Sequence, residues 1–298
     1  MNKILKKIRY VLEAFAARSG LFLFQMMGLK NAANFASFLT SLIGKKHKTH
    51  NLARRNIKES FPDLSSEKVE NILDSMWDNL GRIIGEFIFV SKFTPEDLNK
   101  YVSMHQETKD NISKIKDNAA KTKKGGIIFS AHTGNWEIGP KILIQNGIIV
   151  KTVYRPLNNE AVDKMTSQIR GVDMIPKSTK GNKQIIAEVK KGNFVVIMAD
   201  QKISDGILAP FFGRNAKTTA SIAKLALKYD IPLIPARSIR IGKEFKFEVR
   251  VEKPLEIDDK KIGSDAVTRL TIKINQKLEE WITQFPEQWF WVHDRWKK

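Results

Sequence analysis

Gly125-Gly-Ile-Ile-Phe-Ser-Ala131, followed directly by His132-Thr-Gly-Asn-Trp-Glu137, is the stretch that decides the fold. Its first half is a short apolar run, which is typical of a strand buried on both faces. Its second half places a histidine and a carboxylate five residues apart where that strand ends. In open α/β sheets, sites form at the carboxyl ends of strands. The stretch therefore predicts an α/β sheet and the place of a functional site in it.

Short apolar runs alternate with helical stretches through the rest of the chain. This alternation predicts an α/β fold with a mixed, largely parallel central sheet flanked by helices, and its last strand is expected to be antiparallel or at an edge. Upstream, Ser65 starts a helix that continues through Phe87, and residues 96–124 are a polar connector with one helix, Lys109–Thr122. The expected strands are 126–131, 148–153, 194–199, 231–239 and 245–252, and the expected helices are 137–146, 158–170, 180–191 and 218–229.

Residues 1–44 are expected to form an N-terminal extension, and residues 45–298 the main domain. The extension starts with basic residues, and charges at Glu13, Arg18 and Lys30 leave uncharged runs shorter than the ~20 residues of a bilayer span. This pattern predicts membrane-associating amphipathic helices that lie at the interface, with lysines near lipid headgroups. Two ordinary helices packed on the core fit the same pattern, because hydrophobic periodicity does not separate core from bilayer.

The composition favours an anionic partner. The 298 residues include 51 Lys+Arg and 32 Asp+Glu, a net charge of +19, which suits nucleic acid, an anionic membrane face, a phosphorylated substrate or an acidic carrier protein. Cysteine is absent, which excludes disulfides, cysteine-ligated zinc and an acyl-cysteine intermediate. The absence of cysteine is also typical of a cytosol-facing protein.

The pair of His132 and Glu137 suits activation of a hydroxyl group. An imidazole titrates near ~6.5 and can take a hydroxyl proton, and we expect Glu137 to accept a hydrogen bond from the far ring nitrogen. Residues five apart do not share one helix face, so the chain must turn between them. Gly134 and Asn135 permit that turn, and Pro140 fits the first turn of a following helix.

Three further residues are expected to bind substrate. Arg155 follows an apolar strand and Arg170 ends a helix, and guanidinium groups suit phosphates or a developing oxyanion. Asp200 comes at another strand end, where it can orient a basic residue or the neighbours of His132. Taken singly, each arginine is more often a solvated surface residue. No cofactor or metal is expected.

A serine nucleophile has little support, because no Gly-x-Ser-x-Gly elbow occurs. Ser130 lies beside the motif, but direct attack by the acceptor hydroxyl on an acyl thioester is the simpler mechanism. Pro210-Phe-Phe-Gly213 is expected to be an apolar loop that borders an acyl tunnel or belongs to the core, and Thr218 or Thr219 to cap the next helix. The aromatic C-terminal stretch from Pro286 suits base stacking or a membrane interface.

The chain resembles the lysophospholipid acyltransferase superfamily, and within it the late acyltransferases of lipid A biosynthesis, the Kdo2-lipid IVA lauroyl/myristoyl transferases. The resemblance runs from about residue 45 to the C-terminus. It implies His132 as general base with Glu137 as its partner, and Arg170 and Asp200 as further site residues. The motifs that carry it, in family order, are His132–Glu137, Tyr154-Arg155-Pro with Asn158-Asn159, Arg170-Gly171, Ala199-Asp200-Gln201, Pro210–Gly213, Thr219 and Pro286-Glu-Gln-Trp-Phe-Trp.

The resemblance also implies the reaction and its partners. The donor would be acyl carrier protein, the acceptor a phosphorylated, Kdo-bearing lipid A precursor, and the location the cytoplasmic face of the inner membrane. Asp294 stands where the family usually has a basic residue, and the apolar segment is weaker than the span that many members carry. An acyltransferase for another phospholipid or glycolipid is the alternative, and a nucleic-acid-binding protein lacks any recognised motif.

Overall fold

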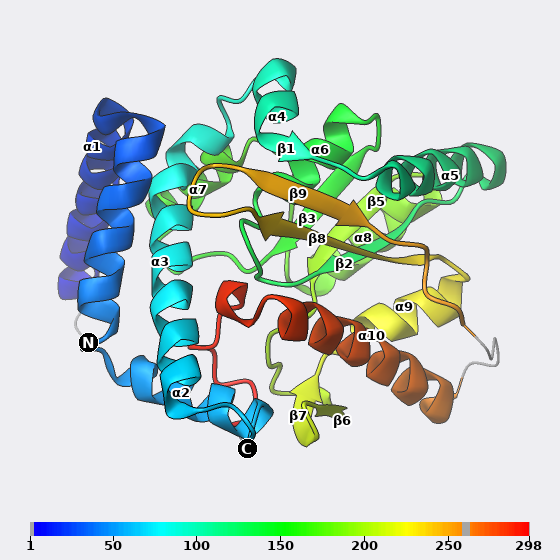
Figure 1. Cartoon of the computed structure of the whole chain (residues 1–298). Coiled ribbons are helices and arrows are strands. Elements are labelled where there is room, and N and C mark those ends of the chain that lie inside the picture. The colour runs from blue at the N-terminus through cyan, green and yellow to red at the C-terminus, as the bar shows by residue number, and fades with distance from the viewer. Residues whose placement is uncertain (1–2, 258–262, 298) are drawn as a thin grey trace.

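The computed structural model describes residues 3–257 and 263–297. Within these residues the chain forms three layers, with helices on both faces of a seven-stranded sheet (Figure 1). The predicted α/β fold with a largely parallel sheet is confirmed. Apolar side chains of successive strand residues face opposite layers, so the central strands are buried on both sides.

The strand that precedes His132, β2 (Gly126–Ser130), lies in the middle of the sheet. Strand order is β1-β9-β8-β2-β5-β3-β4, and β8, β2, β5, β3 and β4 are mutually parallel. β9 pairs antiparallel with β8, as predicted, but β1 covers its outer side, so β9 is not an edge. The other strands are β1 (Val102–Ser103), β3 (Val150–Tyr154), β4 (Met174–Pro176), β5 (Phe194–Met198), β8 (Leu233–Arg240) and β9 (Phe247–Val251).

Two buried clusters hold the layers together, one on each face of the sheet. On one face, helices α8 (Thr179–Lys190), α9 (Ser221–Tyr229) and α10 (Ser264–Gln284) pack with the C-terminal tryptophans against β2 and β5. On the other face, α4 (Pro95–Tyr101), α5 (Gln106–Thr122) and α6 (Ile138–Gln145) pack against the same strands. The helices of both layers pack on the faces of the sheet, and the candidate site lies at the carboxyl ends of the parallel strands.

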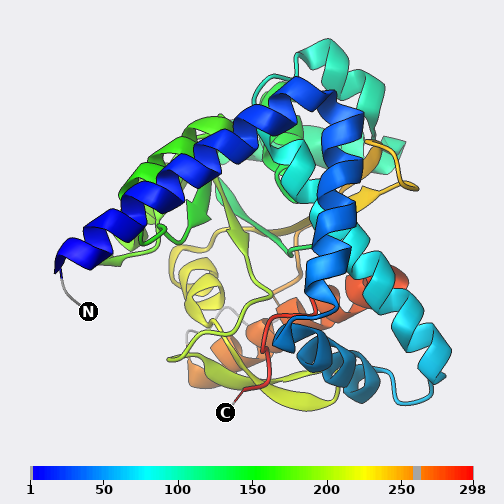
Figure 2. The same cartoon turned by 90° about the vertical axis from the view of Figure 1, so that its left-hand side faces the viewer.

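The N-terminal region packs on the edge of this sandwich. Helix α3 (Ser66–Val90) begins at the predicted Ser65 cap, whose hydroxyl accepts a hydrogen bond from the amide of Lys68. Helix α1 (Lys3–Gly44) breaks at Gly28, where φ is 74°, and its second half packs against α3. Figure 2 shows the first half running along the outside of the molecule, next to α7 (Glu160–Arg170). Helix α2 (Lys48–Ser60) joins α1 to α3.

Several elements differ from the sequence-based expectation. Residues 207–218 form a hairpin of β6 (Ile207–Phe211) and β7 (Arg214–Thr218), not a loop, because Phe212 and Gly213 both adopt the positive φ of a tight two-residue turn. Helix α9 follows Ala220 without a side-chain cap, so the expected threonine cap is wrong. Helix α10 and strands β1 and β4 were not predicted, and the polar connector holds two helices, α4 and α5.

Candidate active site

His132 and Asp200 meet because their strands are neighbours in register. β2 and β5 pair in parallel with Ser130 opposite Met198, so the residues two positions further on lie opposite one another. The His132 amide donates to Asp200 Oδ2 at 2.9 Å, and the imidazole Nδ1 lies 2.9 Å from Oδ1. This double contact fixes the ring and makes Nδ1–H the donor to the carboxylate. Asp200 therefore orients His132.

A third donor holds Asp200 in place. Trp289 Nε1 donates to Asp200 Oδ2 at 2.9 Å, and both side chains are buried. Burial alone would raise the pKa of Asp200, but the attraction of His132 and the three hydrogen bonds hold it well below its usual range. Burial alone would lower the pKa of His132, but the attraction and hydrogen bond of Asp200 outweigh it and raise that pKa. The carboxylate stays ionised beside a strengthened base.

The imidazole Nε2 is the atom left for a substrate. The His132 side chain is 18% exposed, and Nε2 has no hydrogen-bond partner within residues 3–257 and 263–297. The Trp136 ring packs edge-on against the imidazole, with centroids 4.9 Å apart. A hydroxyl within hydrogen-bond reach of Nε2 would meet a base whose other nitrogen is already fixed.

Glu137 contacts Arg170, not His132. The chain turns at Gly134, as expected, and the turn delivers Glu137 to the start of α6, where both carboxylate oxygens lie 3.1 Å from Arg170 Nε. The expected hydrogen bond between Glu137 and the imidazole is therefore wrong. The strand pairing that brings Asp200 to Nδ1 already uses that nitrogen. The terminal amino groups of Arg170 make no hydrogen bond within the described residues, so they are available to an anionic group.

The turn itself is held against β8. Gly134 has φ of 55°, and a Cβ there would lie 2.4 Å from the carbonyl oxygen of Ser238. Only glycine combines this conformation with so close an approach. The fully buried Asn135 accepts a hydrogen bond from the Glu137 amide at 3.2 Å and donates to Glu86 Oε2 at 2.9 Å. The turn is thus anchored on α3.

A buried network from α3, β8 and the C-terminal segment supports that anchor. Arg240 donates to both oxygens of Glu86 at 2.7 Å and to Asn79 Oδ1 at 2.8 Å. Asn79 donates to the Gly134 carbonyl at 3.2 Å. The Gln288 side chain bonds the backbone N–H and C=O of Arg240 at 2.8 and 3.0 Å. Three segments far apart in sequence therefore fix one turn.

Arg155 stands apart from this cluster. It follows β3, two strands away from β2 in the sheet, and its side chain is exposed. It makes no hydrogen bond or ion pair with the residues that the structure describes. Of the five residues singled out from the sequence, the structure joins His132 to Asp200 and Glu137 to Arg170, and leaves Arg155 at the same edge of the sheet.

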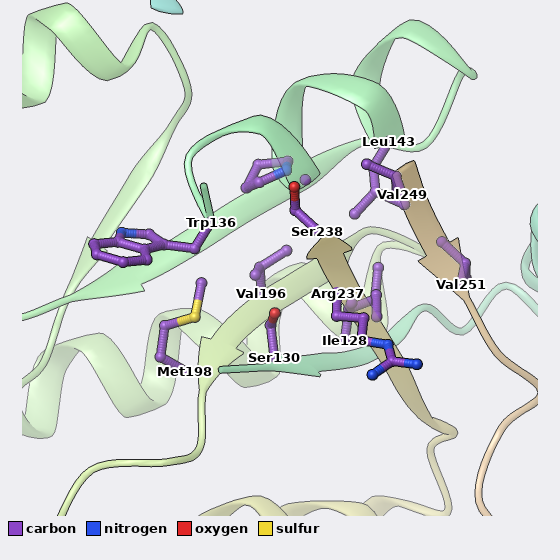
Figure 3. A pocket seen from close by; sticks show the side chains of 13 residues that line it. Ile128, Ser130, Trp136, Leu143, Val196, Met198, Arg237, Ser238, Val249 and Val251 are labelled. Carbon is purple, nitrogen blue, oxygen red and sulfur yellow. The ribbon is translucent and has the colours of Figure 1, made fainter. Parts of the chain in front are cut away.

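A small apolar cavity lies beneath the start of α6 (Figure 3). Trp136 and Met198 lie at one end of it and Val251 at the other, and Ser130 points between them. Its volume of about 20 Å³ is room for about one water molecule. The Pro210–Gly213 segment does not line it, since Phe211 is buried in the cluster on the opposite face of the sheet. That this segment borders an acyl tunnel stays a prediction, and the core alternative holds for Phe211.

The C-terminal aromatic stretch is structural. Trp289 and Trp291 are buried, so neither is available to stack bases or to enter a membrane interface. Asp294, the departure from the usual basic residue, lies 3.8 Å from Arg55. Arg295 is fully buried and donates to the Lys217 carbonyl at 2.6 Å. The stretch serves the site through Trp289 and Gln288.

Sequence reasoning missed the residues that hold the site. Trp289 belongs to the aromatic C-terminal stretch, but nothing in the sequence indicated that its indole Nε1 donates to the buried Asp200. Glu86 and Arg240 each carried a signal, a charge among apolar residues, and Arg240 shares its apolar run with Arg237. Such charges are almost never fully buried unless paired, and that rule could have joined them.

Comparison with known proteins places the whole chain in one family. Residues 1–298 match the family described as bacterial lipid A biosynthesis acyltransferase. A lipid A biosynthesis acyltransferase from Haemophilus influenzae is 24% identical over 83% of this chain and 75% of its own, and a lipid A biosynthesis palmitoleoyltransferase from Escherichia coli is 23% identical over 83% and 78%. A phosphatidylinositol mannoside acyltransferase from Mycolicibacterium smegmatis is 24% identical over 58% of this chain and 57% of its own.

Proposed function

We propose how this chain works from one premise: it belongs to the bacterial lipid A biosynthesis acyltransferase family and is an acyltransferase of lipid A biosynthesis. The reaction we propose transfers a fatty acyl group from acyl carrier protein to a hydroxyl of a Kdo2-lipid IVA-type precursor. The observation that carries the proposal is the imidazole of His132, which Asp200 holds by two contacts while Nε2 stays open.

His132 is the proposed general base. Nε2 takes the proton of the acceptor hydroxyl as its oxygen attacks the carbonyl carbon of the acyl thioester. The carbon–sulfur bond then breaks, and the thiolate of the carrier takes the proton back from Nε2. Asp200 keeps the Nδ1 proton in place throughout and stabilises the imidazolium between the two steps.

Glu137 and Arg170 are proposed to bind the substrates as a unit. The carboxylate holds Arg170 by Nε, and the terminal amino groups, which make no hydrogen bond within the described residues, suit a phosphate or the developing oxyanion. Arg155, exposed at the same edge of the sheet, is proposed to add a second cation for the acceptor phosphates.

The first half of α1 is proposed to rest on the cytoplasmic face of the inner membrane. It exposes many large apolar side chains, which a monomeric soluble protein rarely does over one contiguous surface. No helix within the described residues is both long enough and apolar enough to cross a bilayer. The most exposed apolar side chains of this first half of α1 are Ile4, Leu5, Val11, Leu12, Phe15, Phe22, Leu23 and Met26.

Acyl transfer by the purified enzyme tests the function. The assay uses radiolabelled acyl carrier protein and Kdo2-lipid IVA in detergent, with the product identified by mass spectrometry. Wild-type protein is expected to form an ester, and His132→Ala to lose activity by at least about a thousandfold. His105→Ala is the matched control, because the side chain of this histidine is 66% exposed and its ion-pair partner within the described residues is Glu248 on β9. Full activity in His132→Ala would disprove the mechanism.

A second acceptor is tested in the same assay. The similarity to the phosphatidylinositol mannoside acyltransferase motivates an acceptor that is a mannosylated phospholipid instead of a lipid A precursor. Equal amounts of the two acceptors are offered with one donor. Preferential esterification of the mannosylated lipid would replace the acceptor proposed above and leave the chemistry of His132 unchanged.

A further inference from the structure

A second anion site is suggested by a pocket that His132 does not line, between α1, α3, α4 and the β8–β9 turn. Its volume of about 620 Å³ falls within the range of small-molecule sites. Five of its lining residues are cationic, and one, Glu244, is a carboxylate. The cations are Lys30, Arg82, Lys100, Lys243 and Lys246.

Four of these cations are lysines, and one of them, Lys243, helps to lower the pKa of Asp78. Arg82 is held by Asp78 and Asn34, but none of the four lysines forms an ion pair within the described residues. Such lysines repel one another, and an anion bound among them relieves that repulsion. They come from α1, α4 and the β8–β9 turn, so only the tertiary structure brings them together.

The pocket has a rigid aromatic wall. Phe245 packs against Phe93 and Tyr101, with ring centroids 4.8 and 5.3 Å apart. The β8–β9 turn that carries Lys243 and Lys246 is fastened at its base, where Arg240 bonds the Glu244 carbonyl at 3.3 Å and the buried Glu86 at 2.7 Å. Rigid walls lower the entropic cost of binding a ligand.

Along α1, exposed apolar side chains occur both before and after the residues that line this pocket. Leu29 and Ala33 line the pocket, while Met26, Phe35 and Phe38 on the same helix are 71%, 44% and 63% exposed. A cationic pocket beside an exposed apolar helix matches an amphiphile with an anionic head and acyl tails. An acidic carrier protein would match the lysines but not the apolar face.

We propose that this pocket binds the phosphate headgroup of an anionic bilayer phospholipid, whose acyl tails lie along α1. The proposal rests on the membrane contact proposed above. It gives α1 a specific lipid partner in place of a diffuse attraction to the surface. One lipid clamped by four lysines would also set how the enzyme sits on the bilayer and hence which way His132 faces.

Titration of the full-length enzyme with a short-chain lipid tests the pocket. Dihexanoyl phosphatidylglycerol is the anionic probe and dihexanoyl phosphatidylcholine the zwitterionic one. We expect saturable one-to-one binding of the anionic probe only. A quadruple variant, in which the pocket lysines Lys30, Lys100, Lys243 and Lys246 become Gln, should bind it about 600-fold more weakly, given about fivefold per lysine at a lipid surface.

The matched control changes four lysines of α5. Lys109, Lys114, Lys116 and Lys121 are exposed, and α5 lies on the opposite side of the molecule from α1 (Figure 1). Changing them to Gln alters the net charge equally, and binding should fall by less than about threefold. Equal losses in the two variants, or no saturable binding by wild type, would overturn the proposal.

Two further measurements separate this proposal from its alternatives and from the proposed function. The proposal is wrong if the pocket variant keeps lipid binding but loses affinity for acyl carrier protein. It is also wrong if the KM for a detergent-solubilised acceptor rises in step with the loss of phosphatidylglycerol binding. Either result would assign the pocket to a substrate. His132→Ala should bind phosphatidylglycerol like wild type. Failure of acyl transfer in wild type would refute the function while leaving this binding measurable.

Discussion

Asp200→Asn should disable His132 by reversing its tautomer. Asp200 Oδ2 accepts two hydrogen bonds, from the His132 amide and from Trp289 Nε1, while Oδ1 accepts one from Nδ1. Asparagine has a single oxygen, and placing it at the Oδ2 position satisfies two buried donors. Its amide nitrogen then faces Nδ1 and donates, so the imidazole proton must move to Nε2. A protonated Nε2 cannot act as a base.

The magnitude follows from the hydrogen bonds. The opposite amide orientation would restore the tautomer but leave two buried donors unsatisfied, at about 1–3 kcal/mol each. Loss of the charge that stabilises the imidazolium adds to this. We expect kcat/KM to fall by about 10³–10⁴-fold, about 4–5.5 kcal/mol in the barrier, similar to the same substitution in a serine protease triad.

The pH profile of the activity tests the role of Asp200 independently of the rate. In the wild type Asp200 raises the pKa of His132, so activity should increase with pH through a midpoint above the usual ~6.5. In the variant the attraction is gone, and burial, which lowers the pKa, remains. The midpoint of the pH profile of the residual activity should therefore lie at a lower pH than in wild type.

The assay is acyl transfer to the lipid acceptor from about pH 5 to about pH 9, with enzyme stability checked at each pH. Asp205→Asn is the matched control, because it removes the same charge from an exposed turn residue and should leave both rate and profile unchanged. An Asp200→Asn enzyme with near-wild-type kcat/KM, or with an unmoved acid limb, would refute the reasoning.

Two predictions concern the turn that carries His132. Arg240→Met leaves the Glu86 carboxylate buried without its partner, so the free energy of unfolding should fall by about 3–5 kcal/mol in urea titrations; an unchanged midpoint would contradict the network. Gly134→Ala places a Cβ 2.4 Å from the Ser238 carbonyl at a positive φ, so it should lower activity and reduce the free energy of unfolding by at least about 1 kcal/mol. Gly139→Ala is the control, because its Cβ meets nothing within 4 Å and should not destabilise the protein.

Much of the fold was predictable because its signals are local. The apolar run of β2, the alternation that follows it and the Ser65 cap each depend on residues near one another in the chain. The β6–β7 hairpin was missed because its turn, Phe212-Gly213, has an unusual first residue for positive φ. The C-terminal helix α10 was not recognised beside the more conspicuous tryptophans that follow it.

The candidate site was predictable residue by residue but not pair by pair. His132, Glu137, Arg170 and Asp200 could all be selected from strand ends, helix ends and the resemblance to a family. Their partners could not, because nearness in sequence favoured Glu137 as the neighbour of His132. The 68-residue separation from Asp200 is bridged by parallel pairing of β2 with β5.

The sequence alone determined the α/β class, the strand that ends at His132 and the chemistry that this residue type can perform, because hydrophobic period and side-chain pKa are properties of short segments. Only the tertiary structure decided that Asp200 orients the imidazole while Glu137 holds Arg170. Strand register sets which side chains meet, and register is a property of two segments at once. The same holds for the four lysines of the α1 pocket, whose charges converge only after α1, α4 and the β8–β9 turn have packed.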